Sequence, residues 1–387
     1  MTSNPRVNPF LSAAFAVISA LGTTILGGCD SSSTGTTTGG NGGSGGETGG
    51  NGGASTSGGG GSGGSTTGGT GGTGAGGADA RPEKPAALVS YVTGNDADKD
   101  VTPTGPGLIL MGGGTDVDAA FQWWKGYIAG GDVVVLRASG ADGYNSYLYT
   151  DIGGCDSVET MLVTTPALAA DPYVVWTLEH AEGIFMAGGD QAKYLTAWKD
   201  SPVEEALKKA WQRGAILGGT SAGCAVLGEY MFAAYNDTVY SDEALTDPYN
   251  MYMTMERNFL NVPPLAGWIT DTHFAQRDRM GRLVGFLARI VQDGWSAAPI
   301  GLGVDEKTAV VVDAQGAGQV LGSGAAYVVT TTAPPTLCEA GKPLEFAGLT
   351  VSKIVAGETI TFPSGEVQSM STPLSASGGT LDPSNPY

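Results

Sequence analysis

At 387 residues the chain is long enough for one large domain or two ordinary ones, and its formal net charge is −19. A nucleic-acid-binding surface needs clustered Lys and Arg, so this charge argues against nucleic acid as a partner. The 64 glycines exclude a uniformly globular chain, because 24 of them lie between positions 35 and 77.

The first 28 residues are predicted to be an export signal. Arg6 precedes an apolar run, 10–21, that is shorter than the roughly 20 apolar residues of a membrane-spanning helix. The segment Leu26-Gly27-Gly28-Cys29 resembles a bacterial lipobox, which implies cleavage before Cys29 and lipidation of that cysteine. The alternative is an ordinary or uncleaved signal with a chance cysteine. The predicted location is the bacterial cell envelope, outside the cytoplasm and lipid-anchored, or else the protein is secreted.

Residues 29–83 are rich in Gly, Ser and Thr and are predicted to be a disordered tether, because they cannot bury enough apolar surface to offset the entropy of ordering. A lipid-anchored domain needs such a spacer. Three cysteines follow the tether: Cys155, Cys224 and Cys338. At most one disulfide can form among them, and Cys155 with Cys338 is the pairing to test first, since Cys224 lies in an apolar run.

Residues 84–372 are predicted to form the folded domain. Four apolar runs, 108–111, 132–137, 183–187 and 214–217, each end in a glycine-rich loop. Helical patterns lie between them at 117–129, 192–198 and 203–213. This alternation predicts an α/β fold whose largely parallel sheet is covered on both faces. The glycine loops should converge at the carboxyl ends of the strands, where such sheets bind ligands.

Residues 219–223 read Gly-Thr-Ser-Ala-Gly, which matches the G-x-S-x-G turn that presents a nucleophilic serine between a strand and a helix. The glycines allow a tight turn and close backbone approach, and the N–H of Ala222 would lie near a developing oxyanion. The alternative is a glycine-flanked serine in an ordinary turn. The apolar strand before the motif and the apolar helix after it favour a catalytic Ser221.

A serine nucleophile needs a base, which near neutral pH is usually histidine, and the chain contains two. His180 directly precedes the strand that begins near Gly183, so it should lie at the amino end of that strand, on the wrong edge of the sheet. His273 follows an apolar run and is the predicted base.

A carboxylate should orient the imidazole of His273, and the chemistry alone leaves its identity open. Asp271 is so close to His273 in sequence that its reach back to the ring is not assured. Asp305 and Glu306 both follow the apolar run 301–304, and nothing in their chemistry separates them.

Two arginines follow the histidine. A helix after His273 would place Gln276 and Arg277 on the face of the histidine, by the i+3 and i+4 rule, and Arg277 could then bind a substrate carboxylate. Arg282 lies four residues after Asp278, so its alternative role is a surface ion pair of small energetic weight.

Farther along, Val304 and the runs 309–312 and 325–329 are predicted to be strands without strong helices between them. These extra C-terminal strands should extend the sheet or add a small antiparallel layer. Residues 373–387 are rich in Ser, Gly and Pro and are predicted to be a disordered tail.

Taken together, these motifs resemble peptidase family S51, which contains cyanophycinase and aspartyl dipeptidase (peptidase E). The likeness covers roughly residues 105–330. The segments that occur in the same order in that family are Gly188-Gly189-Asp190-Gln191, Gly219-Thr220-Ser221-Ala222-Gly223, Asp271-Thr272-His273-Phe274-Ala275-Gln276-Arg277 with Gly281-Arg282-Leu283, and Gly301-Leu302-Gly303-Val304-Asp305-Glu306. Four ordered motifs are far more specific than G-x-S-x-G alone.

The resemblance implies a three-layer α/β/α fold similar to class I glutamine amidotransferases. It implies a Ser–His–Glu triad that falls on Ser221, His273 and Glu306, and no cofactor or metal. The oxyanion donors would be the amides of Ala222 and Gly189. The implied substrate-binding residues are Asp190, Gln191, Asp271, Arg277 and Arg282.

The implied activity is that of an exported serine peptidase acting next to aspartyl residues. Its partners would be an aspartyl-containing peptide or a cyanophycin-like polymer that yields β-Asp-Arg dipeptides, a membrane contacted only through the lipid anchor, and a second copy of the chain in a homodimer. Cyanophycinases usually carry Gln where this chain has Thr272, which affects substrate identity more than reaction class.

Two alternative functions remain open on the sequence. In an α/β-hydrolase esterase with the same serine turn, the histidine normally comes last in the triad and near the end of the domain, whereas more than 100 residues follow His273. A non-catalytic surface module would keep the fold and bind ligand only, and Ser221 would then be inert towards fluorophosphonate probes.

Overall fold

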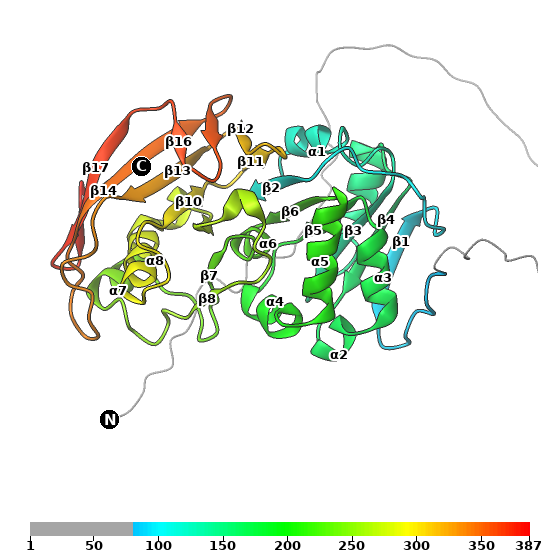
Figure 1. Ribbon diagram of the computed structural model, residues 1–387, viewed down its shortest axis with the longest axis horizontal. Coiled ribbons are helices and arrows are strands. Elements are labelled where there is room, and N and C mark those ends of the chain that lie inside the picture. The colour runs from blue at the N-terminus through cyan, green and yellow to red at the C-terminus, as the bar shows by residue number, and fades with distance from the viewer. Residues whose placement is uncertain (1–79) are drawn as a thin grey trace, which may run out of the picture. The chain divides into compact units, whose positions relative to one another are not determined.

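The computed structural model describes residues 80–387. The predicted signal segment, Cys29 and most of the predicted tether lie outside these residues. The described residues form two β-sheets with helices packed against them (Figure 1).

The first sheet has ten strands in the order β1-β4-β3-β5-β6-β2-β11-β12-β15-β16. Its five central strands, β4, β3, β5, β6 and β2, run parallel, and the others join them in antiparallel fashion. The bounds are β1 Val89–Gly94, β2 Gly107–Met111, β3 Asp132–Arg137, β4 Ser157–Leu162, β5 Gly183–Met186, β6 Ile216–Thr220, β11 Thr308–Val312, β12 Ala317–Gly322, β15 Thr359–Thr361 and β16 Glu366–Val367.

Helices cover both faces of this sheet. Leu108 and Leu110 of β2 pack in one hydrophobic cluster with side chains of α3, α4 and α5, whereas Ile109 and Met111 pack in another with side chains of α1. Alternate residues of a strand point to opposite faces, so the two clusters are the two faces (Figure 1). The helices are α1 Asp118–Trp124, the π-helix η1 Tyr147–Ile152, α2 Pro166–Ala169, α3 Pro172–His180, α4 Gln191–Trp198 and α5 Pro202–Arg213. The predicted α/β fold is confirmed.

Helix α5 illustrates how the sequence sets these elements. Pro202 occupies the first turn, two glutamates complement the positive end of the helix dipole, and Arg213 lies in the last turn. Gly214 ends the helix in the left-handed conformation, with φ of 103°. The buried apolar residues, Val203, Ala206, Leu207 and Ala210, recur at helical spacing.

The second sheet has eight strands in the order β18-β17-β14-β13-β10-β9-β7-β8. Strands β7, β9 and β10 run parallel, and the remaining pairs are antiparallel. The bounds are β7 Tyr230–Phe232, β8 Met255–Arg257, β9 Trp268–Thr272, β10 Ile300–Val304, β13 Ala325–Thr331, β14 Phe346–Val355, β17 Ser371–Ser377 and β18 Thr380–Asp382. The accompanying helices are α6 Ala222–Ala225, α7 Ser241–Thr246, α8 Met280–Gln292 and the 3-10 turns η2 Pro263–Leu265 and η3 Ala275–Arg277.

The C-terminal strands therefore do both of the things predicted for them. Strands β11 and β12 extend the first sheet, while β10 and β13 belong to the second, largely antiparallel sheet (Figure 1). The two sheets share a core, because Trp268 and Val304 of the second pack in the same cluster as Leu108 and Val310 of the first.

The prediction of a disordered tail at 373–387 is wrong. Strand β17 pairs with β14, and Leu374 and Ala376 are buried between exposed neighbours. This is the alternation of a strand with one face on the core, which the Ser, Gly and Pro content obscured. The hydroxyl of Tyr387 accepts a hydrogen bond from the Met280 amide and donates one to Asp278.

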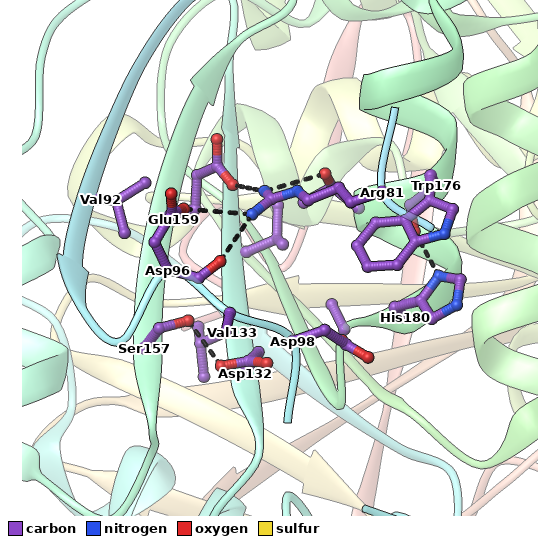
Figure 2. Close-up of a pocket in the computed structure, with 14 residues that line it drawn as sticks. Arg81, Val92, Asp96, Asp98, Asp132, Val133, Ser157, Glu159, Trp176 and His180 are labelled. Carbon is purple, nitrogen blue, oxygen red and sulfur yellow. Dashed lines mark hydrogen bonds and ion pairs between the residues drawn. The ribbon is translucent and has the colours of Figure 1, made fainter. Parts of the chain in front are cut away.

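The predicted tether also ends earlier than position 83. Arg81 forms an ion pair with the buried Glu159 (Figure 2). Its guanidinium also lies 4.5 Å from the ring centroid of Tyr173. Burying the carboxylate of Glu159 requires such a partner, so Arg81 already takes part in the folded domain.

The cysteine pairing to test first, Cys155 with Cys338, does not form within residues 80–387, where both thiols and that of Cys224 are free. Cys155 packs beside the cluster under α1, whereas Cys338 belongs to the core of the second sheet. The two cysteines are in different layers of the fold, which their spacing in the sequence did not reveal.

Candidate active site

Ser221 lies in a strained turn between β6 and α6. Its φ is 53° and its ψ is −118°, a conformation that residues other than glycine rarely adopt. A Cβ on Gly219 would lie 2.4 Å from the Gly223 carbonyl carbon, and one on Gly223 would lie 1.9 Å from the Met186 oxygen. The glycines on both sides are therefore sterically required, as the G-x-S-x-G pattern predicted.

His273 follows β9 and faces this turn. Its backbone also has a positive φ, 49°, and its amide donates a hydrogen bond of 2.8 Å to the Gly112 carbonyl. The imidazole Nε2 lies 2.8 Å from Ser221 Oγ, and Nδ1 lies 2.6 Å from Glu306 Oε1. With Nδ1–H donating to the carboxylate, Nε2 is free to accept the serine proton.

The structure also shows which of the two adjacent carboxylates, Asp305 or Glu306, contacts His273. The carboxylate of Asp305 is buried and accepts hydrogen bonds from the amides of Ala275 and Ala325, so it joins β10 to its neighbours. Glu306 points to His273 instead, while its amide donates to the side-chain oxygen of Gln276. The structure thus brings Ser221, His273 and Glu306 together in the order that the triad chemistry requires.

The electrostatics keep His273 neutral. Burial lowers the pKa of its imidazole, and the cations of Arg277 and Arg279 lower it further, whereas the hydrogen bond to Glu306 opposes the shift. A neutral imidazole at neutral pH is the form that can act as a base.

The glycine loop 112–114 packs against the side chains of His273 and Glu306. A Cβ on Gly113, whose φ is 97°, would lie 2.4 Å from Cε1 of His273, and one on Gly114 would lie 3.2 Å from Oε2 of Glu306. The first of the predicted glycine loops therefore packs against the triad, at the carboxyl end of β2.

The predicted oxyanion donors lie beside the nucleophile. Ala222 occupies the first position of α6, where a helix offers no internal acceptor for the amide. Gly189 lines the same cavity as Ser221, and a Cβ on the preceding Gly188 would come within 3.5 Å of Ser221 Cβ. Both residues thus lie near Ser221, and their role as oxyanion donors stays a prediction.

A cavity of about 380 Å³ opens in front of Ser221. Its lining includes four of the predicted substrate-binding residues: Asp190, Gln191, Arg277 and Arg282. Gln191 donates a hydrogen bond of 3.2 Å to the Phe232 carbonyl, which joins the loop after β5 to β7. The exposed guanidinium of Arg277 makes no hydrogen bond or ion pair within residues 80–387, so it is available to an anionic ligand.

Asp271, also predicted to bind substrate, does not reach the cavity. It is 2 % exposed and accepts hydrogen bonds from Nε and Nη2 of Arg282. Arg282 in turn donates to the hydroxyl of Thr238, 3.0 Å away. Arg282 is therefore a buried group with a buried partner and not half of a surface pair with Asp278. Asp271 acts by positioning Arg282.

The sequence interpretation missed Arg279. Its side chain lines the cavity, donates 2.8 Å to the Thr272 carbonyl and lies 3.4 Å from Asp271. Burial and the neighbouring Arg282 lower its pKa. The one available signal was its position between Arg277 and Arg282. The loop residues Tyr235, Asp237 and Thr238 also line the cavity, and no motif marked them.

His180 is far from this chemistry, as predicted. It ends α3 just before β5, at the amino ends of the strands, where its Nδ1–H donates 2.8 Å to the Trp176 carbonyl (Figure 2). Its ring stacks on Trp176 with centroids 3.8 Å apart.

Membrane-spanning helices and clustered metal ligands are both absent from the described part of the chain. Within residues 80–387, no helix has the length and apolar character needed to span a bilayer. In the same range, no group of three or more His, Cys, Asp or Glu side chains is arranged to bind a metal ion.

Comparison with known proteins places these residues in a family context. Residues 147–319, which contain Ser221, His273 and Glu306, match the sequence model of peptidase family S51. The chain is 32% identical to a cyanophycinase of Nostoc sp. over 182 residues, which cover 46% of this chain and 55% of that protein. It is also 32% identical to a cyanophycinase of Synechococcus elongatus over 185 residues, 47% and 52% of the two chains. The chain thus spans about half the length of the curated relatives that it matches.

Among solved structures, the chain is similar to a peptidase from an acI-B1 Actinobacterium. That match has a TM-score of 0.43 and 19% sequence identity, and it covers 67% of this chain and 98% of the other. The resemblance to peptidase family S51 that the four motifs predicted is confirmed by the family match and the cyanophycinase relatives.

Proposed function

With residues 147–319 matching peptidase family S51 as the premise, we propose that this protein is a serine peptidase with Ser221 as nucleophile, His273 as base and Glu306 as the orienting acid. The observation that carries the proposal is the hydrogen-bonded chain from Ser221 Oγ through both nitrogens of His273 to Glu306. A structural serine in a turn needs neither a neutral histidine nor a carboxylate behind that histidine.

In the proposed reaction, Ser221 Oγ attacks the carbonyl carbon of a peptide bond while its proton passes to His273 Nε2. The amides of Ala222 and Gly189 stabilise the oxyanion. His273 then gives the proton to the departing amine, the C–N bond breaks, and an ester to Ser221 remains. Water attacks this ester as His273 takes its proton, and the proton returns to Ser221 when the acid product leaves.

We further propose that the peptide bond lies next to an aspartyl residue, as in a cyanophycin-like polymer of β-Asp-Arg units. The cyanophycinase relatives support this assignment. The cavity supports it as well, because Arg277 lines the space that contains Ser221 and its guanidinium has no partner among residues 80–387. Guanidinium groups bind carboxylates through paired hydrogen bonds. Arg277 would bind a carboxylate of the substrate while Arg279 and Arg282 keep that wall positive.

Replacement of the nucleophile tests the activity. We expect Ser221→Ala to abolish both the release of dipeptide from β-Asp-Arg polymer and labelling by a fluorophosphonate probe, with unchanged thermal unfolding. Ser364→Ala, at an exposed serine outside the cavity, is the matched control and should retain both. Full hydrolysis by Ser221→Ala would rule out the mechanism.

We also propose that the protein is exported and attached to the cell envelope through a lipid on Cys29. The lipobox-like segment before Cys29 and the Gly-rich stretch after it motivate this placement. Incorporation of a radioactive fatty acid at Cys29 is the measurement that tests it.

A further inference from the structure

The cavity is lined by charged side chains of both signs, and its two acidic residues, Asp190 and Asp237, are exposed and form what we call its rim. Three arginines, Arg277, Arg279 and Arg282, line the side next to His273. Two carboxylates, those of Asp190 and Asp237, line it from other loops. Within residues 80–387, Arg277 and Asp237 are the members of these two groups that form no ion pair, and a substrate with charge of a single sign could pair with only one of them. The cavity is therefore complementary to a ligand that carries both a carboxylate and a cation.

The loop that carries Asp237 is held in a fixed conformation. Ala234 and Asp237 both have positive φ, 53° and 87°, which is uncommon away from glycine. The Tyr235 amide donates 3.0 Å to the Thr254 hydroxyl, and the Thr238 hydroxyl accepts from the buried Arg282. Non-glycine residues in such conformations persist only where surrounding contacts enforce them, and they concentrate at binding sites.

The two rim carboxylates differ in the hydrogen bonds and ion pairs that they already make. Asp190 accepts a hydrogen bond from the Ala192 amide at the start of α4, and Lys193 lies 3.9 Å from its other oxygen. Asp237 accepts only from the adjacent Thr238 amide, through Oδ1, and forms no ion pair within residues 80–387. Asp237 is thus the carboxylate with an oxygen to offer a cationic ligand.

An aromatic ring accompanies this carboxylate. The side chain of Tyr235 lines the cavity two residues before Asp237 and is 43 % exposed. Its hydroxyl is directed to Glu256, with 3.4 Å between the oxygens. A guanidinium is planar, so it can stack on an aromatic ring while it donates hydrogen bonds in its own plane to a carboxylate. An ammonium group can do only one of these with full geometry.

We propose that Asp237 and Tyr235 form a subsite for the guanidinium of an arginine side chain in the substrate, in the same cavity as the arginines that receive its carboxylate. This inference rests on the proposed peptidase function and adds the residues that select the cationic side chain. It predicts that the enzyme prefers arginine to lysine, and to the uncharged isostere citrulline, as the substrate side chain bound at this subsite.

The test compares, on the full chain, two peptides with the same short poly-aspartate backbone, one carrying arginine on its β-carboxyls and the other carrying citrulline. Removing a partly exposed charge-assisted hydrogen bond should lower kcat/KM for the arginine peptide roughly tenfold in Asp237→Asn, mainly through KM. The value for the citrulline peptide should not change. Asp242→Asn removes the same charge from α7, outside the cavity, and should leave both values unchanged.

A pair of variants at Tyr235 tests the stacking. Tyr235→Phe keeps the ring and should retain the preference for arginine, whereas Tyr235→Leu should reduce it. Equal losses for the arginine and citrulline peptides in Asp237→Asn would overturn the subsite and leave the peptidase assignment standing. Wild-type protein that cleaves neither peptide and does not react with the fluorophosphonate probe would overturn the proposed function, and this inference with it.

Discussion

The imidazole of His273 is placed among cations, which affects the pH range of the proposed activity. Burial and the charges of Arg277 and Arg279 lower its pKa below the usual 6.5. Catalysis needs the unprotonated ring, so activity is lost as the pH falls through the pKa of His273. The acid limb of kcat/KM should therefore lie below pH 6.5.

Removal of one of these arginine charges should shift the acid limb of the pH profile of kcat/KM. Arg279→Gln takes away a charge that opposes protonation of His273, so we expect the acid limb of kcat/KM to shift upward, toward the ordinary histidine value. Arg289→Gln removes an arginine that is paired with Asp293, and it should leave the limb in place. Superimposable pH profiles for wild type and Arg279→Gln would contradict this account of the histidine.

At the residue scale, the sequence best predicted the features that depend only on residues adjacent in the chain. The glycines around Ser221 indicate the strained turn directly, and with two histidines in the chain the position of His180 before a strand excluded it. The chemistry alone could not separate Asp305 from Glu306, because adjacent residues differ only in the direction of their side chains. The burial of Asp271 and the rim position of Asp237 depend on contacts between distant segments, so no local pattern predicted them.

The elements that carry the triad belong to different sheets. Ser221 follows β6 of the ten-stranded sheet, His273 follows β9 of the eight-stranded sheet, and Glu306 lies between β10 and β11, where the chain passes from one sheet to the other. The alternating pattern correctly predicted strands, helices and the convergence of the glycine loops. It did not predict a second sheet of this size, because the pairing of strands far apart in the chain leaves no periodic signal.

The segment after His273 is held in place by Tyr387. The Tyr387 hydroxyl accepts 2.8 Å from the Met280 amide and donates 2.9 Å to Asp278, and the Tyr387 ring packs against Phe274 with 5.9 Å between centroids. These contacts lie on both sides of Arg277 and Arg279. Strands β17 and β18 thereby deliver a side chain that braces the arginine wall of the cavity.

Loss of this hydroxyl should destabilise the fold measurably. We expect Tyr387→Phe to lower the free energy of unfolding by about 1 kcal/mol, because the Met280 amide and Asp278 lose a shared partner. Urea unfolding followed by tryptophan fluorescence measures the change. Tyr149→Phe removes a hydroxyl that makes no hydrogen bond within residues 80–387 and should be neutral. Equal stability of the two variants would show that Tyr387 contributes through its ring alone.

At the scale of the whole molecule, the proposed lipid attachment determines where the enzyme acts. We expect the wild-type protein to fractionate with membranes and to incorporate radioactive palmitate, and Cys29→Ser to lose both properties. Cys155→Ser replaces a free thiol of the folded domain and should keep both. Palmitate incorporation that persists in Cys29→Ser would exclude Cys29 as the attachment point.

Composition was a poor guide to the C-terminal end of the folded domain. At the other end, Arg81 belongs by composition to the predicted tether, yet it pairs with the buried Glu159. The C-terminal segment 373–387 has the composition of a tail, yet two buried side chains on one face of β17 suffice to add it to the sheet. A strand with only one face on the core needs few apolar residues, so the average composition of such a segment does not show that it is ordered.

The division of the triad between two sheets makes the proposed catalysis sensitive to the packing between them. No single element fixes the 2.8 Å between Ser221 Oγ and His273 Nε2, because Ser221 follows a strand of one sheet and His273 follows a strand of the other. A core substitution far from the cavity can therefore lower kcat without removing any group that touches the substrate, since small displacements of reacting groups are costly.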